Sequence, residues 1–128
     1  TPLILGDFSA STLRVNGRLQ ATSAYSATVV LSIVTGSVAV DAALSNSFEL
    51  TANANFTLAN PTNLVKGMNI SFEIIQDATG SRLITYGSLY KFATNSDKSL
   101  STSANARDFM SCHYNGTHLL CNLGKAYI

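Results

Sequence analysis

The chain has 128 residues, of which 46% are hydrophobic and only 12% are charged, and its formal net charge is +1. The Lys and Arg residues are spread singly along the sequence, whereas binding to a nucleic-acid backbone needs clustered cations. The longest apolar stretch, residues 28–34, is far shorter than the roughly 20 residues of a membrane-spanning helix. We therefore expect neither nucleic acid nor membrane as a partner, and a surface this poor in charge predicts self-association.

Residues 1–27 show no sustained hydrophobic period, and we interpret them as an extended N-terminal arm. A frayed terminus is the alternative interpretation. Large apolar side chains would have no use on a frayed end, and the arm contains several of them: Leu3, Ile4, Leu5, Phe8, Leu13, Val15 and Leu19. We therefore expect the arm to lie on a neighbouring subunit.

From residue 28 onward, short β-branched runs alternate with small polar residues and turn signals. The runs that fit a strand in length and residue type are residues 28–34, 38–44, 47–52, 56–59, 70–76, 82–87, 89–93, 109–114 and 117–123. No long helical period occurs, although residues 101–108 have room for one helical turn. We predict an all-β fold, a jelly-roll-like β-sandwich over residues 28–128.

Two connections have the sequence of tight hairpins. Residues 77–80, Asp-Ala-Thr-Gly, are expected to join the runs 70–76 and 82–87 as neighbouring strands. Asn115 and Gly116 favour a two-residue type I′ turn between the last two runs, because that turn needs positive φ at both positions. The pairs that this register predicts are Tyr114 with Thr117, His113 with His118, Cys112 with Leu119, and Met110 with Cys121.

The last hairpin also contains both Cys and both His residues of the chain. Strand periodicity puts Cys112 and Cys121 on one face and His113 and His118 on the other, which excludes a Cys2His2 metal site on this hairpin. The cysteines lie on a diagonal in this register, so we expect buried thiols rather than a disulfide. Two opposed imidazoles are too few to hold a metal, so we expect ordinary hydrogen bonds, with a metal shared across subunits as the alternative.

No catalytic motif occurs in the sequence. A nucleophile elbow, a phosphate loop and an HExxH motif are all missing. The carboxylates show no paired spacing that indicates acid and base roles; they are Asp7, Asp41, Glu49, Glu73, Asp77, Asp97 and Asp108. We therefore expect no enzyme activity, no catalytic residue, no metal and no cofactor.

Residues 56–114 contain four phrases in a fixed order: LANPTNL, QDATGSR, a Lys-Phe strand, and LSTSANARD before the last hairpin. In this order they resemble a C-terminal β domain of tailed-bacteriophage virion proteins, and residues 76–82 are the most specific part. Residues 5–9, LGDFS, are similar to a phrase that often begins modules of phage fibres. The resemblance implies a virion component, commonly trimeric, without enzyme activity and assembled in the host cytoplasm.

On this basis we expect a bacteriophage structural protein. The main hypothesis is a capsid decoration (cement) protein that binds the outer head surface, because one compact domain with an arm lacks the shaft of a fibre. Its partner is then the major capsid protein or another virion protein. The arm residues that we expect to attach to the capsid are Leu3, Ile4, Leu5, Phe8 and Leu13.

The alternative hypothesis is the receptor-binding tip of a phage tail or head fibre. Such a tip needs exposed tyrosines that contact host glycans, and the available ones are Tyr25, Tyr86, Tyr90 and Tyr114. Tyr90 is the better candidate than Tyr114, because the alternation places Tyr114 on the apolar face of its hairpin. A fibre-borne glycan hydrolase is the least favoured hypothesis.

The strands also predict an oligomer. Runs such as residues 28–34 and 70–76 have apolar residues on both faces, more than one sandwich core can hide. We therefore expect a closed cyclic oligomer, and the resemblance implies a homotrimer. Ile75, Ile84 and Leu120 are expected nearest the subunit contacts, because each lies opposite the core set of its strand.

Overall fold

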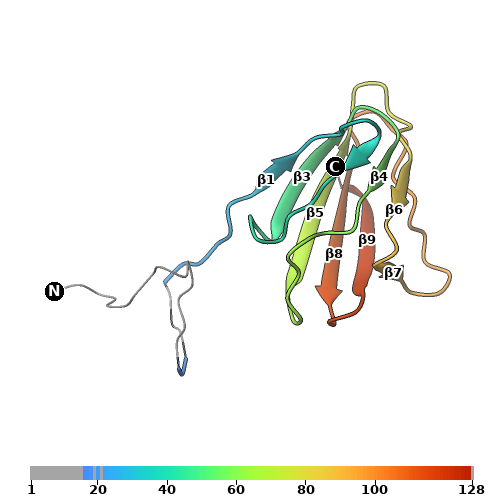
Figure 1. The fold of residues 1–128 in the computed structure, drawn as a ribbon. Coiled ribbons are helices and arrows are strands. Elements are labelled where there is room, and N and C mark those ends of the chain that lie inside the picture. Colours follow the sequence, from blue (N-terminus) through green and yellow to red (C-terminus); the bar gives the residue numbers. More distant parts are fainter. Residues whose placement is uncertain (1–15, 19, 21, 128) are drawn as a thin grey trace.

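The structure of the chain, a computed structural model, describes residues 16–18, 20 and 22–127 (Figure 1). These residues form nine strands and no helix, so none of them forms a helix that could span a membrane. The strands are β1 (Val29–Leu31), β2 (Ser37–Val38), β3 (Ser47–Ala52), β4 (Phe56–Leu58), β5 (Asn69–Gln76), β6 (Ile84–Tyr86), β7 (Tyr90–Phe92), β8 (Arg107–Tyr114) and β9 (Leu119–Tyr127). The predicted all-β class is confirmed.

The arm residues singled out above lie outside the described part of the chain: Leu3, Ile4, Leu5, Phe8, Leu13, Val15 and Leu19. Their expected contacts with a capsid or a neighbouring subunit therefore stay predictions. The described residues that lead into β1 do contact the domain, because the hydroxyls of Ser26 and Ser45 lie 2.9 Å apart and those of Thr28 and Ser47 lie 3.0 Å apart.

The strands form two sheets that face each other. The larger sheet has the order β1-β3-β5-β8-β9-β7, and the smaller sheet has the order β2-β4-β6. Buried side chains of both sheets form one core, for example Phe72 and Met110 from the larger sheet and Leu58 from the smaller one. The chain is thus a β-sandwich, as predicted, with three strands packed against six.

The first six strands alternate between the two sheets, so that β1, β3 and β5 belong to the larger sheet and β2, β4 and β6 to the smaller one (Figure 1). Each circuit of the chain through both sheets therefore adds one strand to each sheet. The strands added to one sheet by successive circuits run parallel. A jelly roll is built from antiparallel Greek keys, whereas five of the seven strand pairs here are parallel. The structure does not have the expected jelly-roll connectivity, because residue alternation predicts which side chains are buried but not the direction of the neighbouring strand.

The parallel register stacks equivalent apolar side chains on top of each other. Phe48 of β3 pairs with Phe72 of β5, and their rings stack with centroids 5.4 Å apart. In the next inward-facing row, Leu50 pairs with Ile74, and both side chains are 2% exposed. These rows form a continuous hydrophobic interior along the strands of the larger sheet. Burial of such apolar side chains is the main stabilising contribution for this kind of fold.

The expected strand 38–44 is a strand only at its first residue. Asp41 Oδ1 accepts a hydrogen bond from the backbone N–H of Ala43 at 2.9 Å and another from the Asn63 side chain at 2.7 Å. This local side-chain bonding bends the backbone into a turn that leads back toward β3. Beyond Val38 the run forms only an isolated bridge from Asp41 to Thr62; Val40 and Ala42 are buried, whereas Leu44 is 68% exposed.

Residues 76–82, the most specific part of the phage resemblance, carry the chain from β5 in the larger sheet to β6 in the smaller one. The expected hairpin between these strands is therefore wrong. Gln76 is only 2% exposed, and its side-chain amide accepts from the backbone nitrogen of Arg82 at 2.9 Å and donates to the backbone oxygen of Arg82 at 3.0 Å. These two bonds replace a strand-to-strand ladder at the start of the loop, so the two strands diverge into different sheets.

Asp77 closes the same loop. Its Oδ1 accepts the backbone N–H groups of Thr79 and Gly80, and its Oδ2 lies 2.6 Å from the Arg82 guanidinium. The hydrogen bond from Arg82 holds the pKa of the Asp77 carboxyl below its ordinary value. Gly80 has a φ of +73°, and a Cβ at this position would lie 2.5 Å from the Thr102 backbone oxygen. A glycine is therefore required where the loop packs against residues 101–108.

Residues 100–108, the family phrase LSTSANARD, are fixed by a buried carboxylate. Asp108 is 1% exposed and accepts the backbone N–H and the hydroxyl of Ser101, both at 2.6 Å, and the backbone N–H of Ala126 at 2.8 Å. The backbone N–H of Ser81 in turn donates to Thr102 O at 2.8 Å. The two phrases QDATGSR and LSTSANARD thus form one structural network.

The last hairpin, β8 and β9, has a different register from the predicted one. Asn115 does not have positive φ, and its side-chain oxygen accepts the backbone N–H groups of Thr117 and His118 at 2.9 and 2.8 Å. The connection is therefore four residues long, and Tyr114 pairs with Leu119. A shift by two residues keeps the side chains of the paired strand residues on their predicted faces, because strand side chains alternate with a period of two, whereas Thr117 and His118 lie in the turn.

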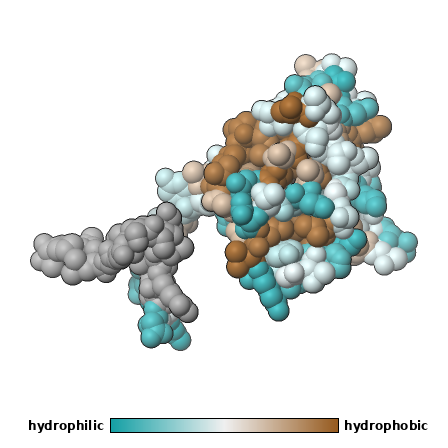
Figure 2. Space-filling view, in the orientation of Figure 1, coloured by the Kyte–Doolittle hydropathy of each residue, from teal (hydrophilic) through white to brown (hydrophobic). Residues whose placement is uncertain are grey.

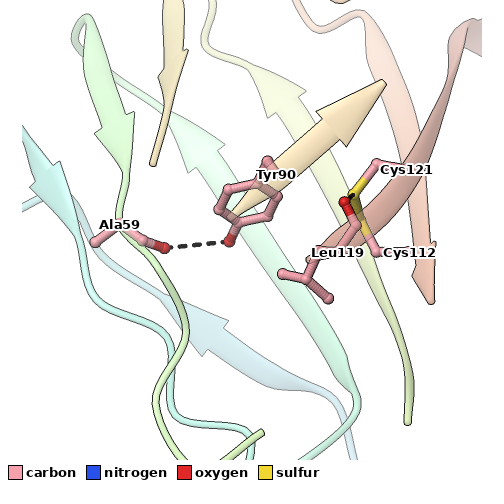
Figure 3. The surroundings of a disulfide bond; sticks show 5 residues. All are labelled: Ala59, Tyr90, Cys112, Leu119 and Cys121. Atoms are coloured by element: carbon pink, nitrogen blue, oxygen red, sulfur yellow. Dashed lines mark hydrogen bonds between the residues drawn. A yellow bond between two sulfur atoms is a disulfide. The ribbon is translucent and has the colours of Figure 1, made fainter. Parts of the chain in front are cut away.

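This register places Cys112 directly opposite Cys121, with Cα atoms 4.2 Å apart, and the two residues form a disulfide. Both cysteines are 4% exposed and lie in the core close to Leu119 (Figure 3). The expectation of free thiols is therefore wrong, because it depended on the two-residue turn that put the cysteines on a diagonal.

Replacing Gln76 with Ala is expected to lower the free energy of unfolding by about 2–3 kcal/mol, because two backbone groups of Arg82 lose their partners in a buried place. Urea denaturation measures the change. Ser71→Ala on the outer face of the same strand is the matched control, with an expected change within about 0.5 kcal/mol. Equal losses in both variants would contradict the role given to the Gln76 amide.

Reducing the disulfide is expected to lower the free energy of unfolding by about 2–3 kcal/mol, the contribution of a cross-link that closes a short loop. Denaturation with and without a thiol reductant measures this difference. The double variant Cys112→Ala/Cys121→Ala is the control, because its stability should not respond to the reductant. Detection of two free thiols in the unfolded, unreduced protein would show that the disulfide does not form.

Candidate binding groove

The structure separates the cysteines from His113 as the sequence predicted, with the cysteines inside and His113 exposed on the outer face of the larger sheet, whereas His118 lies in the turn before β9. The predicted opposition of His113 and His118 is wrong, because the observed register pairs His113 with Leu120. His113 Nδ1 lies 2.9 Å from Asn69 Oδ1 on β5, an ordinary hydrogen bond of the kind expected. Within the part of the chain that the structure describes, no three potential metal ligands lie together.

Tyr90, the tyrosine expected to contact glycans, lies in the core. It is 6% exposed, and its hydroxyl donates to the backbone oxygen of Ala59 at 3.2 Å (Figure 3). Burial raises the pKa of the Tyr90 hydroxyl above its ordinary value. The expectation for Tyr90 is therefore wrong, because the hydroxyl group that would bind a ligand has its partner inside the protein.

Tyr86 is the tyrosine that reaches a surface groove. The groove has a volume of about 500 Å³ and lies between β6 and β7, the terminal strands of the smaller and the larger sheet. These two strands lie at one side of the sandwich, on the right in Figure 1. The ring of Phe92 from β7 lies against Tyr86 with centroids 4.8 Å apart, and both side chains are half-buried. The groove therefore has an aromatic wall made by both sheets.

The aromatic wall continues into the core. Tyr86 contacts Tyr90 with centroids 5.7 Å apart, Tyr90 contacts Phe72 at 6.4 Å, and Phe72 stacks on Phe48. Burial also raises the pKa of the Tyr86 hydroxyl. Because each ring packs against the next, the wall of the groove is held in place by the best-packed part of the molecule.

Asn60, from the family phrase LANPTNL, shapes the turn between β6 and β7. Its side-chain oxygen accepts the backbone N–H of Leu89 at 2.9 Å, and its side-chain nitrogen donates to the hydroxyl of Ser88 at 3.1 Å. A Cβ on Gly87 would lie 2.3 Å from Asn60 Oδ1 and 2.8 Å from the Asn60 backbone nitrogen. This close approach requires glycine and brings the β6–β7 turn directly against the β4–β5 connection.

The loop after β7 closes one end of the groove. The Tyr86 hydroxyl donates to the backbone oxygen of Lys98 at 2.9 Å. Asp97 accepts from Lys125 Nζ at 2.7 Å and from the Ser99 hydroxyl at 2.6 Å, and the hydrogen bond from Lys125 is the main cause that lowers the pKa of the Asp97 carboxyl. These bonds fix the loop that presents Lys98 and Ser99 to the groove.

The charged residues of the groove lining are both basic. They are Lys91 and Lys98, and no Asp or Glu of the described residues is part of the lining. The ion pairs among the described residues are Arg82 with Asp77, Arg107 with Glu73, and Lys125 with Asp97, so neither Lys91 nor Lys98 is in one of them. The lining of the groove also includes Thr85, Ser88 and Ser99.

The residues expected at subunit contacts divide between two environments. Ile75 is half-buried and Leu120 is 49% exposed, both on the outer face of the larger sheet. Ile84 faces inward instead, because it pairs in parallel with buried Phe56 and packs against the core. The premise for Ile84 is therefore wrong, whereas the subunit contacts themselves stay a prediction.

The groove could be found only in part from the sequence. Tyr86 was among the candidate aromatics, but Phe92, Lys91 and Lys98 were not assigned to any site. Their one signal is the Lys-Phe strand of the family phrase, which contributes Lys91 and Phe92. Nothing in the sequence pattern shows that β6 and β7 end their sheets on the same side.

The fold is a small β-sandwich with a groove between the edge strands of its two sheets. Residues 34–119, about two thirds of the chain, match the family described as "Putative phage tail fibre C-terminal domain". No curated protein and no solved structure matches the chain.

The chain therefore belongs to the phage tail fibre C-terminal domain family, and it is a structural component of a bacteriophage virion. The resemblance observed over residues 56–114 is confirmed by this match.

Replacing Asn60 with Ala is expected to lower the free energy of unfolding by about 1–3 kcal/mol, because the Leu89 N–H loses its acceptor and the β6–β7 turn loses its anchor. Thermal or urea denaturation measures this. Asn53→Ala is the control, because Asn53 is exposed and makes no side-chain hydrogen bond among the described residues. An unchanged stability of the Asn60 variant would refute the anchoring role.

Proposed function

We propose that the chain is the receptor-binding end module of a phage tail fibre. The observation that carries this proposal is the family match over residues 34–119, because this range includes every residue that lines the groove between β6 and β7. A tail-fibre function thus accounts for both the family and a groove with an aromatic wall.

The composition of the groove supports a binding function. Ligand sites combine apolar and aromatic walls with a few well-placed polar groups. Here the aromatic wall is Tyr86 and Phe92, and the polar residues of the lining include Lys91, Lys98, Thr85, Ser88 and Ser99. Asn60 and Gln76 of the family phrases hold backbone groups of the loops, and the Lys-Phe phrase contributes Lys91 and Phe92 to the groove. We accordingly propose a binding module without enzyme activity.

We further propose that the module is a homotrimer in contact through the outer face of the larger sheet. A row across this face contains Val30, Glu49, Glu73 and Phe109, which the strand register places side by side. Val30 is 70% exposed and Phe109 is 43% exposed, and Leu120 lies on the same face. Three exposed apolar side chains lie on this one sheet face: Val30, Phe109 and Leu120. We infer that contact with a second subunit buries them.

A capsid decoration (cement) function is the second candidate, because a different apolar surface favours attachment to another virion protein. Figure 2 shows apolar side chains gathered on the face toward the reader. A hollow of about 450 Å³ in the molecule is lined mainly by apolar residues, among them Val29, Leu31, Val40, Leu44 and Phe48. In this function the major capsid protein covers the hollow, and the arm residues Leu3, Ile4, Leu5, Phe8 and Leu13 carry the attachment.

The two candidates predict different places in the virion. Immunogold labelling of intact phage with antibodies against the chain is expected to mark the ends of the tail fibres, and the same antibodies should slow adsorption to host cells. The purified chain, added in excess, should also compete with phage for the cell surface. Gold particles distributed over the head would contradict the tail-fibre proposal and support decoration.

A further inference from the structure

The aromatic wall of the groove offers a flat apolar surface next to polar groups. Tyr86 and Phe92 are only half-buried although each packs against another ring, so part of each ring remains at the surface of the groove. A pyranose ring has one face of C–H groups and a rim of hydroxyls, which matches an aromatic surface with hydroxyls at its edge.

The hydroxyls beside this wall differ in what they can offer to a ligand. Thr85 Oγ1 is already bonded to Thr57 Oγ1 at 2.6 Å, and Ser99 is engaged by Asp97 and Lys125. Ser88, in contrast, accepts a hydrogen bond from Asn60, which leaves its own proton for a ligand oxygen. The Asn60 side chain thus orients the hydroxyl of Ser88 as a donor at the turn between β6 and β7.

The basic residues of the groove indicate that its ligand is negatively charged. Lys91 and Lys98 are residues of the groove lining and are in no ion pair among the described residues. Two carboxylates act on the Tyr86 hydroxyl: Asp97 is paired with Lys125 at 2.7 Å, and Asp108 is buried and accepts hydrogen bonds from Ser101 and Ala126. Lysines without an ion pair raise the local concentration of anions and bind carboxylate or phosphate oxygens.

We propose that the groove between β6 and β7 binds an anionic sugar unit of the host envelope, with the ring against Tyr86 and Phe92 and its carboxylate or phosphate at Lys91 and Lys98. This inference rests on the proposed receptor-binding function and adds the chemical class of the receptor and the residues that recognise it. Carboxylate and phosphate share the required chemistry, and the ligand pairs in the experiment distinguish them.

The direct test is calorimetric titration of the purified chain with two matched pairs of oligosaccharides. One pair compares a uronic-acid oligosaccharide with its neutral hexose counterpart, and the other compares a sugar phosphate oligosaccharide with its dephosphorylated form. Binding of at least one anionic member, with affinity at least about tenfold above its neutral partner, is expected from a charge-assisted hydrogen bond. Equal affinity within both pairs, or no binding of any of the four, would overturn the proposal.

The variant Lys91→Gln/Lys98→Gln is expected to lose that preference for the anion, with binding weaker by about tenfold or more. Lys66→Gln is the matched control, because Lys66 is an exposed lysine that does not line the groove. Ser88→Ala tests the hydroxyl and should weaken binding of the anionic and neutral members alike. Equal weakening by Lys66→Gln and the double variant would overturn the assignment of the groove.

Competition with phage adsorption separates this inference from the function on which it rests. If the wild-type chain competes for host cells and the Lys91→Gln/Lys98→Gln variant competes equally well, the receptor-binding function stands and the groove proposal is wrong. If the wild-type chain does not compete, the receptor-binding function itself is wrong, and the titrations then show only a saccharide site on another kind of virion protein.

Discussion

The side-chain amide of Gln76 determines how the chain passes from one sheet to the other. It binds both the backbone nitrogen and the backbone oxygen of Arg82, and it does so in the core, where an unpaired amide would be costly. Because of this link, β5 ends and β6 begins at fixed places in different sheets. The position of β6 then decides where the smaller sheet ends, and with it where the groove against β7 opens.

The family phrases have a common physical role in this arrangement. Asp77 and Gly80 close the loop that follows Gln76, Asp108 holds the segment against which that loop packs, and Asn60 holds the turn before β7. The side chains of Gln76, Asp77, Asp108 and Asn60 bind backbone groups where no strand ladder is available. Three of the four family phrases therefore maintain the connections of the fold, while the fourth, the Lys-Phe strand, contributes Lys91 and Phe92 to the groove.

The sequence predicted the faces of the strands better than their partners. Alternation placed Met110, Cys112 and Leu119 on the inner face of the last hairpin, and all three are buried. The register was wrong by two residues because the Asn115 side chain forms a four-residue turn, a choice between local hydrogen bonds that residue type alone does not decide. A register error of two residues leaves each strand side chain on its correct face. It pairs Cys112 with Leu119 instead of Cys121, so the disulfide is not predicted.

The groove was less predictable for a related reason. Tyr86 and Tyr90 are four residues apart and have the same chemistry, yet one reaches the surface and the other lies in the core. The difference arises because they belong to different sheets, which depends on the long-range arrangement of β4, β6 and β9. Ile84 also faces the core rather than the surface because β6 pairs with β4, a pairing that the sequence pattern did not predict.

The place where the chain enters the sandwich sets how the domain bears mechanical load. β1 is an edge strand that pairs with β3 over only three residues, and Ser26 and Thr28 add two side-chain contacts before it. Tension transmitted from the N-terminal side therefore acts first on this short ladder, whereas the disulfide-linked strands β8 and β9 lie further along the same sheet. The covalent cross-link protects the far side of the sandwich, and resistance to pulling depends on the few hydrogen bonds of β1.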